Sequence, residues 1–386
     1  MFIGIKNVSY PTFWIQKGLH RKERLLTATV SDMLAISLLL CIAGCVVGFR
    51  NTHRRSGSPW IAQAQVDSDL IEKPAWAAGG LVSDIVNALI KSPLYTLMKP
   101  LARQALINTA EKASIPWVSR RESLKAKQTE IDRYFKDLEV SGMTYPKYYT
   151  QPFHAYDLGN LNFDAAYECE SATMSMALRV WPSEQLTAEE AQMRLRSSFL
   201  DTVDSYIGKN PPPQTCLDVG CSVGVSSFYL ADKWPSAAIT GVDLSPHFLS
   251  VAVQRQKALG DKYDRITWRH ANMETPPDEW KDQYDLTAAS FMFHELPTAP
   301  AIDILQQMVH VTKPDGVIAI TDNDPKSSVI QNLPPAIFTL MKSTEPHSDE
   351  YYAFAMERAL ERLGCVDVKT VQSDPRHRTI LARKVG

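Results

Sequence analysis

The sequence predicts an α/β protein with a doubly wound, mostly parallel sheet of seven strands, whose last strand is antiparallel, preceded by a helical extension. Two observations carry this prediction. From about residue 215, short apolar runs alternate with helical stretches, which is typical of a parallel sheet covered by helices on both faces. The chain then closes with the apolar runs Cys365–Val371 and Arg378–Arg383, which a short turn can join only as an antiparallel pair.

Composition bounds the size and the partners of the protein. The 386 residues are 45% apolar and 22% charged, which suffices for one sizeable core with an appendage and excludes a disordered chain. Residues 1–66 carry eight Lys and Arg against two acids, whereas residues 67–386 carry 33 against 41. Because the body of the protein is acidic, we expect no nucleic-acid partner.

The first 66 residues resemble a targeting leader. Residues 33–49 are uncharged, and these 17 residues reach the lower limit for a membrane span but exceed an ordinary signal-peptide core. Residues 50–66 lack acids and are rich in Arg, Ser, Thr and Gln, as transit peptides are. A bipartite leader to a plastid is therefore expected for 1–66. A retained membrane anchor at 33–49, which would associate the protein with a membrane, and an ordinary buried helix remain as alternatives.

Helices are expected to fill residues 67–144, the helical extension. Apolar residues recur there at helical spacing, with an interruption at Pro100, and Ser123–Leu138 has a charged helical pattern. This extension packs on the main domain or, alternatively, forms a pair of membrane-surface helices.

The main domain is expected over residues 145–386, and it begins with helices. The first is predicted over Phe163–Trp181, and Thr187 with Glu190 fits a capping box that opens a second helix, ending near Ile207. The strands that follow are predicted at Thr215–Val219, Ala238–Asp243, Ile266–His270, Leu286–Phe291 and Val317–Thr321. The helices between and after them are predicted at Ser226–Lys233, Pro246–Leu259, Ala301–His310 and Ser348–Leu363.

A glycine turn follows the first of these strands. Gly220 and Gly224 allow a ligand to approach the backbone, and N–H groups at the start of the next helix are free to meet its polar groups. The spacing G-x-x-x-G disfavours a dinucleotide, which needs a glycine where Ser222 stands. Asp218, at the end of the strand, is suited to accept a hydrogen bond from a ligand ammonium group or a water.

A second acid supports a nucleoside-containing cofactor. Asp243 ends the next strand, 23 residues after Gly220, where a carboxylate usually binds both hydroxyls of a ribose. A carboxylate there disfavours a 2′-phosphate. The alternative is that Asp243 only caps the helix that starts near Pro246.

Several of these motifs resemble those of class I S-adenosylmethionine-dependent methyltransferases, and most closely the type-11 and ubiquinone-biosynthesis-like group. The similarity extends from Pro146 to Lys384 and rests on residues 217–224, 241–245, 269–274, 293–297 and 313–316. Residues 151–156, 159–161 and 340–346 further resemble uncharacterised plastid methyltransferases of plants and algae. The resemblance implies the class I methyltransferase fold and S-adenosyl-L-methionine as cofactor.

The resemblance also implies which residues bind the cofactor. Asn272 stands where the group commonly has an acid that contacts the adenine, and its carbonyl can still accept the adenine N–H. The backbone N–H of Met273 would meet the adenine ring. The cofactor-binding residues are thus predicted to be Asp218, Gly220, Cys221, Ser222, Gly224, Asp243, Leu244, Asn272, Met273, Ser290 and Phe291.

The acceptor side is predicted from position alone. His294 and Glu295 follow the fourth strand, beside the cofactor, and are the predicted catalytic pair: His294 acts as a base or a substrate ligand, or it merely packs. The predicted substrate-binding residues are Tyr156 and Asn160, before the first core helix, and Arg376 and Arg378, which would hold an acidic acceptor. Alternatively, Tyr156 and Asn160 only pack locally, and the two arginines only solvate the surface of their turn. No ligand spacing predicts a metal site.

The predicted activity is methyl transfer from S-adenosyl-L-methionine to a small-molecule acceptor, for which an acidic metabolite is one candidate. Two alternatives remain: a methyltransferase for a protein or nucleic acid, and a membrane-tethered module that binds the cofactor without methyl transfer. The sequence leaves open the acceptor atom, the need for a base and the oligomeric state.

Overall fold

The computed structural model describes residues 93–154, 156–332 and 345–386. Within these ranges, none of the helices is both long enough and apolar enough to cross a membrane. The predicted leader, its apolar segment 33–49, the start of the helical extension and most of the segment 340–346 lie outside the described residues.

A seven-stranded sheet forms the centre of the protein. Its strand order is β3-β2-β1-β4-β5-β7-β6, and β7 alone runs antiparallel to its neighbours. The predicted fold class is therefore confirmed. The strands are β1 (Thr215–Val219), β2 (Ala238–Asp243), β3 (Ile266–His270), β4 (Tyr284–Ser290), β5 (Thr312–Asn323), β6 (Cys365–Gln372) and β7 (His377–Lys384).

The strand bounds differ from the predicted ones mainly in β5. The first three strands match the prediction at every residue, but β5 is 12 residues long and includes Asp322 and Asn323 beyond the apolar run. It pairs with β7 along Val317–Asn323. Because backbone pairing continues past the apolar residues, the apolar pattern underestimates the length of the strand. It therefore gives no sign that polar residues belong to the end of β5.

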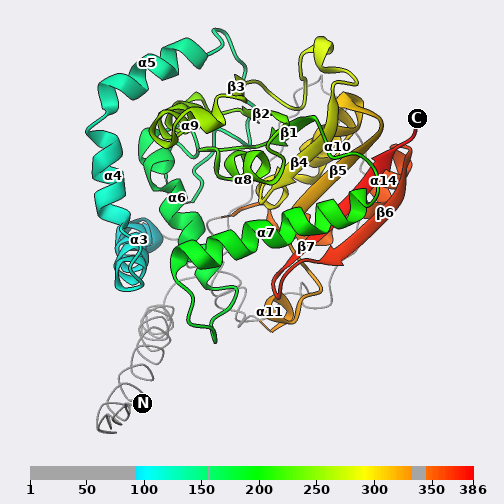
Figure 1. Ribbon diagram of the computed structural model, residues 1–386. Coiled ribbons are helices and arrows are strands. Elements are labelled where there is room, and N and C mark those ends of the chain that lie inside the picture. The colour runs from blue at the N-terminus through cyan, green and yellow to red at the C-terminus, as the bar shows by residue number, and fades with distance from the viewer. Residues whose placement is uncertain (1–92, 155, 333–344) are drawn as a thin grey trace, which may run out of the picture. The chain divides into compact units, whose positions relative to one another are not determined.

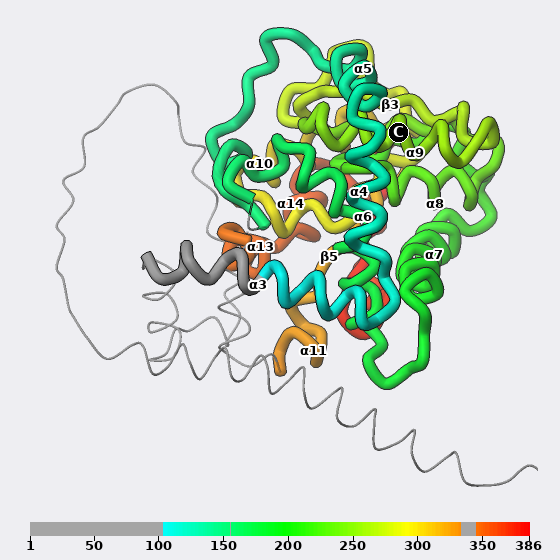
Figure 2. Tube along the Cα trace, turned by 90° about the vertical axis from the view of Figure 1, so that its left-hand side faces the viewer, coloured from blue at the N-terminus to red at the C-terminus, as the bar shows by residue number. Residues whose placement is uncertain are grey.

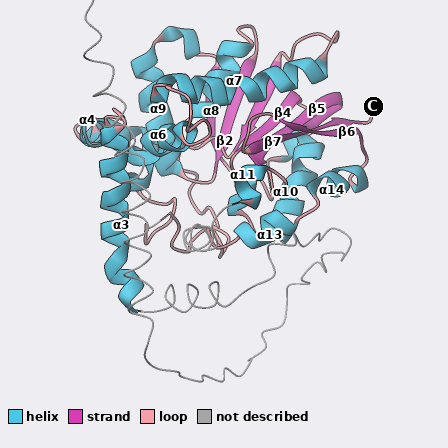
Figure 3. Ribbon diagram, turned by 90° about the horizontal axis from the view of Figure 1, so that it is seen from below, coloured by secondary structure: helices cyan, strands magenta, loops and turns pink. Residues whose placement is uncertain are grey.

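Helices cover both faces of the sheet (Figures 1 and 3). The side chains of β1 alternate between the two faces: Cys216 packs with one set of helices, and Leu217 and Val219 pack with the other. The first set is α7 (Ala188–Ile207), α8 (Val225–Lys233) and α9 (Pro246–Leu259). The second set is α10 (Thr298–Val311), α13 (Ser348–Ala353) and α14 (Met356–Arg362). A short helix, α11 (Ser328–Gln331), follows β5.

The N-terminal helices run along one side of the domain (Figure 2). They are α3 (Pro93–Lys112), α4 (Trp117–Lys125) and α5 (Gln128–Leu138), and α4 and α5 contact α6 (Phe163–Leu178) and α9 respectively. Pro100 does not interrupt α3, because an internal proline removes one hydrogen bond without having to end a helix.

Three helices were predicted longer than they are. The charged stretch that was predicted as one helix is split at Ala126 and Lys127. The last helix is split into α13 and α14 at Phe354 and Ala355, both of which are buried. α6 ends at Leu178, whereas α7 begins with the predicted capping box, in which Thr187 and Glu190 bond each other's backbone N–H.

Candidate active site

The glycine turn after β1 is held by the protein's own backbone. The N–H groups of Gly220 and Cys221 both donate to the carbonyl oxygen of Val242, at 2.9 and 3.0 Å. Gly220 has a φ of 67°, and a Cβ there would lie 2.5 Å from the sulfur of Met292. The glycine turn was expected to leave its own backbone N–H groups free for a ligand, together with those of the first turn of the next helix. For Gly220 and Cys221 this is wrong, because β2 already accepts both hydrogen bonds.

The rest of the turn is equally well packed. Gly224, the N-cap residue of α8, has a φ of 81°, and a Cβ there would lie 2.4 Å from the ring of Trp268. Ser222 has a φ of 52°, and its N–H donates to Oδ2 of Asp243 at 2.8 Å. The glycines thus allow close packing within the protein. The turn orients Asp243 through the N–H of Ser222, and it does not offer a row of free N–H groups to a ligand.

Asp218 carries a buried oxygen that has no partner. Its Oδ2 accepts hydrogen bonds from the hydroxyls of Ser226 and Ser227, at 2.6 and 2.5 Å. Its Oδ1 has no hydrogen-bond partner in the described part of the chain. Burial raises the pKa of Asp218 to about 6. Since an unpaired buried acceptor is costly, this oxygen fits the predicted ammonium or water donor.

Arg196 is a residue of this site that the sequence analysis missed. It lies on α7, is 5% exposed, and holds its guanidinium 4.9 Å from the centre of the Phe291 ring. Burial lowers its pKa, while the charge of Asp218 acts in the opposite direction. Among the described residues, Nε of Arg196 and Oγ of Ser290 lack hydrogen-bond partners. An arginine on the apolar face of a helix, beside Leu195 and three residues before Phe199, was the available sequence clue.

These side chains surround the carboxyl ends of β1 and β4. A carboxylate oxygen of Asp218, the hydroxyl of Ser290 and Nε of Arg196, all buried, require donors and acceptors that the described residues do not supply. The amino-acid part of S-adenosyl-L-methionine offers an ammonium and a carboxylate group. The residues therefore fit the cofactor that the resemblance implies.

Asp243 faces the predicted ribose position. It is 8% exposed, and burial raises its pKa to about 6. Its Oδ1 accepts the N–H of Ser245 at 2.8 Å and lies 3.5 Å from the hydroxyl of Tyr149, whereas its Oδ2 accepts only the N–H of Ser222. Oδ2 therefore keeps an open lone pair for a ligand hydroxyl.

The adenine side of the site follows β3. Oδ1 of Asn272 accepts the N–H of Glu274 at 2.9 Å, so one of its two lone pairs is used within the turn. The side chain of Met273 is buried in the core, and its N–H has no hydrogen-bond partner within the described ranges. The carbonyl oxygen of Leu244 lies 3.2 Å from Nε2 of His270. Because this oxygen already has a partner, the side chain of Leu244 is the part of the residue that can face the cofactor.

His294 forms a buried pair with Asp322, the polar residue near the end of β5. Nδ1 of His294 lies 2.8 Å from Oδ1 of Asp322, and its backbone N–H donates to Oδ2 at 3.1 Å. Although burial by itself lowers the pKa of His294, Asp322 raises it to about 10. At neutral pH His294 is thus an imidazolium, which is a poor general base but a good ligand for an anion.

Glu295 and Asn160 lie within hydrogen-bond distance of each other. Nδ2 of Asn160 donates to Oε2 of Glu295 at 3.3 Å, and burial raises the pKa of Glu295. Glu345 lies 3.8 Å from Nε2 of His154. Burial raises the pKa of Glu345, but the neighbouring His154 and the charge of His294 together lower it to about 2. Glu345 and His154 were not predicted as site residues.

Tyr156 has a different role from the predicted one. Its hydroxyl donates to Oε2 of Glu168 at 2.5 Å, and the guanidinium of Arg103 lies 5.6 Å from its ring and also bonds Glu168. Glu168 is 1% exposed. The hydroxyl of Tyr156 is thus bound in an ion-pair cluster that joins α3 to α6, instead of facing an acceptor.

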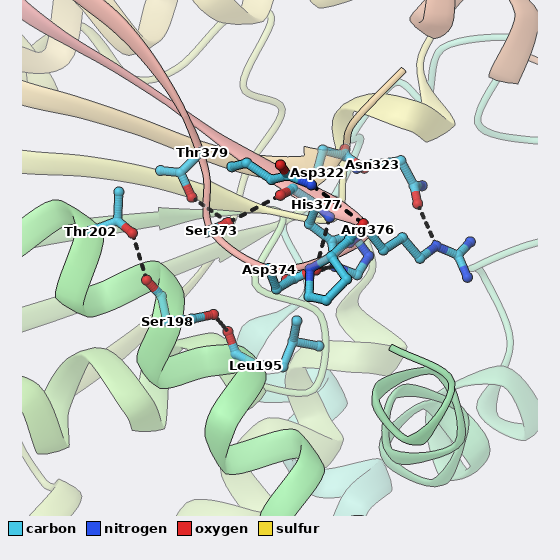
Figure 4. A network of polar contacts seen from close by, with 12 residues as sticks. Leu195, Ser198, Thr202, Asp322, Asn323, Ser373, Asp374, Arg376, His377 and Thr379 are labelled. Atoms are coloured by element: carbon cyan, nitrogen blue, oxygen red, sulfur yellow. Dashed lines mark hydrogen bonds and ion pairs between the residues drawn. The ribbon is translucent and has the colours of Figure 1, made fainter. Parts of the chain in front are cut away.

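The two predicted arginines lie in unlike surroundings. Arg376, in the turn between β6 and β7, donates Nε to Oδ1 of Asn323 at 3.0 Å (Figure 4). Arg378 is 5% exposed and pairs with Glu357 of α14 at 2.9 Å, so its charge stabilises the packing of α14 on the sheet. Within the described ranges, no group of three or more acids, cysteines or histidines is arranged to hold a metal ion.

Comparison with known proteins identifies the central part of the chain. Residues 216–316 match the family model of a methyltransferase domain. Malonyl-[acyl-carrier protein] O-methyltransferase of Anoxybacillus flavithermus is 40% identical over 89 residues, which are 23% of this chain and 31% of that protein. Trans-aconitate 2-methyltransferase of Pseudomonas paraeruginosa is 33% identical over 86 residues, 22% of this chain and 27% of that protein.

The similarity is confined to part of each protein. The chain spans about a third of the length of these two curated relatives. Among solved structures, the carbon methyltransferase of CurJ matches with a TM-score of 0.44 and 12% identity, covering 79% of this chain and 84% of that chain. The resemblance to class I methyltransferases is confirmed for the central domain, whereas the similarity to plastid proteins stays a prediction.

Proposed function

Because residues 216–316 form a methyltransferase domain, we propose that the protein transfers a methyl group from S-adenosyl-L-methionine to a small-molecule acceptor. The observation that carries the proposal is the set of buried, unpartnered polar atoms on Asp218, Ser290 and Arg196. Asp218 would hold the ammonium group of the cofactor, Arg196 its carboxylate, and Asp243 its ribose. When bound, the cofactor supplies a methyl group on a positively charged sulfur, which leaves as a neutral thioether.

The acceptor is proposed to be acidic. His294, kept protonated by Asp322, and the terminal nitrogens of Arg376 offer donors to an anion on the acceptor side of the site. Two relatives are named for malonyl-[acyl-carrier protein] and trans-aconitate, both of which contain carboxylates. A carboxylate already carries the lone pair that attacks the methyl carbon, so no base has to remove a proton. In this reaction His294 holds and orients the acceptor.

The proposal is tested with the full chain and methyl-labelled cofactor. The protein is incubated with separate panels of carboxylic acids, phenols and amines, and with a protein and nucleic-acid extract. Label in methyl esters of the acids is the expected result. Label only in amines or in the macromolecular fraction would overturn the acidic small-molecule acceptor, and cofactor binding without any labelled product would favour a binding module.

The location of the protein is a separate proposal. We propose that residues 1–66 direct it to a plastid, on the strength of their basic, acid-free composition after an apolar segment. A fluorescent reporter fused after residue 66 should enter the organelle. Reporter fluorescence that stays in the cytosol, or that stays with membranes through 33–49, would contradict this.

A further inference from the structure

The segment between α5 and α6 crosses the carboxyl ends of β2 and β3. Three contacts hold it there, each to a residue more than 90 positions away in the sequence. The N–H of Val140 donates to Nδ1 of His270 at 2.9 Å, and the hydroxyl of Tyr148 donates to Glu274 at 2.7 Å. The hydroxyl of Tyr149 reaches Oδ1 of Asp243 at 3.5 Å. The segment 140–149 thus lies against the adenosine end of the proposed cofactor site, outside the matched methyltransferase domain.

A cleft of about 510 Å³ separates this segment from the turn after β3. Residues 140–146 line one side, and Asn272, Glu274 and Thr275 line the other. Asn272 is the residue that is expected to meet the adenine. The cleft therefore borders the adenine position, and its outer wall is the segment that precedes the methyltransferase domain.

Tyr149 follows this wall by three residues and is fixed by its neighbours. Its ring stacks on that of Tyr145, with centroids 6.3 Å apart and an angle of 10° between the planes. Tyr145 also lies near the ring of His270, at 6.2 Å. Burial raises the pKa of Tyr149 well above its usual value, so its hydroxyl keeps its proton. A neutral phenol can donate one hydrogen bond and accept another.

The lone pairs of Asp243 are divided unequally. Oδ1 receives both the N–H of Ser245 and the hydroxyl of Tyr149, whereas Oδ2 receives only the N–H of Ser222. A carboxylate oxygen has two lone-pair positions, so Asp243 has room for one ribose hydroxyl and not for two. The second ribose hydroxyl would meet the oxygen of Tyr149, which can accept its proton while donating its own to Asp243.

We propose that Tyr149 is a cofactor-binding residue, which accepts a hydrogen bond from one ribose hydroxyl and passes one on to Asp243. The inference rests on the proposed function, since it concerns the same cofactor site. It adds to the site a residue from the segment between α5 and α6, which lies outside the matched residues 216–316.

The test uses the full chain, with S-adenosylhomocysteine as the probe and calorimetry as the measurement. Tyr149→Phe keeps the ring and removes the hydroxyl, and it should weaken binding about tenfold, the loss of roughly one hydrogen bond. Tyr134→Phe is the matched control, because the Tyr134 hydroxyl bonds only Glu130, four residues earlier in the same helix. An unchanged thermal unfolding midpoint in both variants confirms that the fold persists.

Ribose analogues separate a hydrogen bond from mere packing. The wild-type protein should bind both the 2′-deoxy and the 3′-deoxy forms of the probe more weakly than the parent. In Tyr149→Phe, one of the two deletions should have no further effect, because its partner is already gone. Equal losses in both proteins for both analogues, or unchanged binding by Tyr149→Phe, would overturn this inference alone. No binding by the wild-type protein would overturn the proposed function as well.

Discussion

The cofactor side and the acceptor side of the site are built in different ways. On the cofactor side, Asp218, Asp243 and Asn272 each end or follow a strand, and their mutual spacing is set by strand-turn-helix units. On the acceptor side, His294 meets Asp322, 28 residues away, and Asn160 meets Glu295, 135 residues away. The first side is determined locally and the second by tertiary packing. A local unit can be recognised in a sequence, whereas a pairing across the fold cannot.

The difference also extends to charge. On the cofactor side, the pKa values of Asp218 and Asp243 are both raised by burial, to about 6, and neither acid has an ion-pair partner in the described part of the chain. On the acceptor side, acids and bases occur in close pairs, Asp322 with His294 and Glu345 with His154. Cofactor residues should therefore act on affinity, and acceptor residues on turnover and its pH dependence.

The largest effect is expected from Asp243→Ala. This change removes the proposed ribose ligand and also the acceptor for the N–H groups of Ser222 and Ser245. Affinity for S-adenosylhomocysteine should fall about 100-fold, because the charge-assisted hydrogen bond to one ribose hydroxyl is lost and the turn loses the carboxylate that holds it, while the fold persists. Calorimetry measures the affinity and circular dichroism the fold. Asp232→Ala, on the exposed side of α8, serves as control, and equal affinities of the two variants would refute the assignment of Asp243.

The acceptor side is tested by Asp322→Asn. Because the raised pKa of His294 depends on Asp322, the wild-type protein should process a carboxylate acceptor from neutral pH up to about 10 and lose activity above it. In the variant the imidazolium is lost at lower pH, so the alkaline limb of the kcat/KM profile should shift downward. At pH 8, kcat/KM should fall about 100-fold, since an anion then faces a neutral imidazole. Unchanged cofactor affinity is the internal control, and identical pH profiles would return His294 to a packing role.

Arg196→Met tests whether the cofactor side includes more than its motifs. Methionine keeps the long apolar stem on α7 and removes the guanidinium that lies over the ring of Phe291. Affinity for S-adenosylhomocysteine should fall about 30-fold, because the carboxylate of the ligand loses a charge-assisted partner. An analogue of S-adenosylhomocysteine without the carboxylate group should bind the wild-type protein and Arg196→Met with equal affinity. A 30-fold loss for this analogue as well would mean that Arg196 only supports the pocket.

The sequence predicted the fold and the cofactor acids for the same physical reason. The bounds of β1, β2 and β3 were right at every residue, because these buried strands consist of short apolar runs that end at a turn or an acid. Asp322 escaped notice because β5 continues by backbone pairing into polar residues. For Tyr156 the sequence left a pocket role and local packing open, and its hydrogen bond to Glu168 of α6 favours packing. Arg196 could have been suspected only from its place on an apolar helix face.

The smallest effect on ligand binding is expected from Arg376, in the turn between β6 and β7. Its neighbour Arg378 should affect stability instead, so the two arginines give the sharpest contrast. Arg376→Ala should raise KM for a carboxylate acceptor about tenfold with little change in kcat, because one partly exposed ionic contact is lost. Arg378→Ala should instead lower the free energy of unfolding by about 2 kcal/mol, since the partly buried Glu357 loses its ion pair and keeps only the hydrogen bond from Thr370. Chemical denaturation and steady-state kinetics measure the two effects separately. If Arg376→Ala destabilised the fold and Arg378→Ala raised KM, the acceptor would approach from the α14 face of the sheet, and the acceptor side would have to be rebuilt around Glu357.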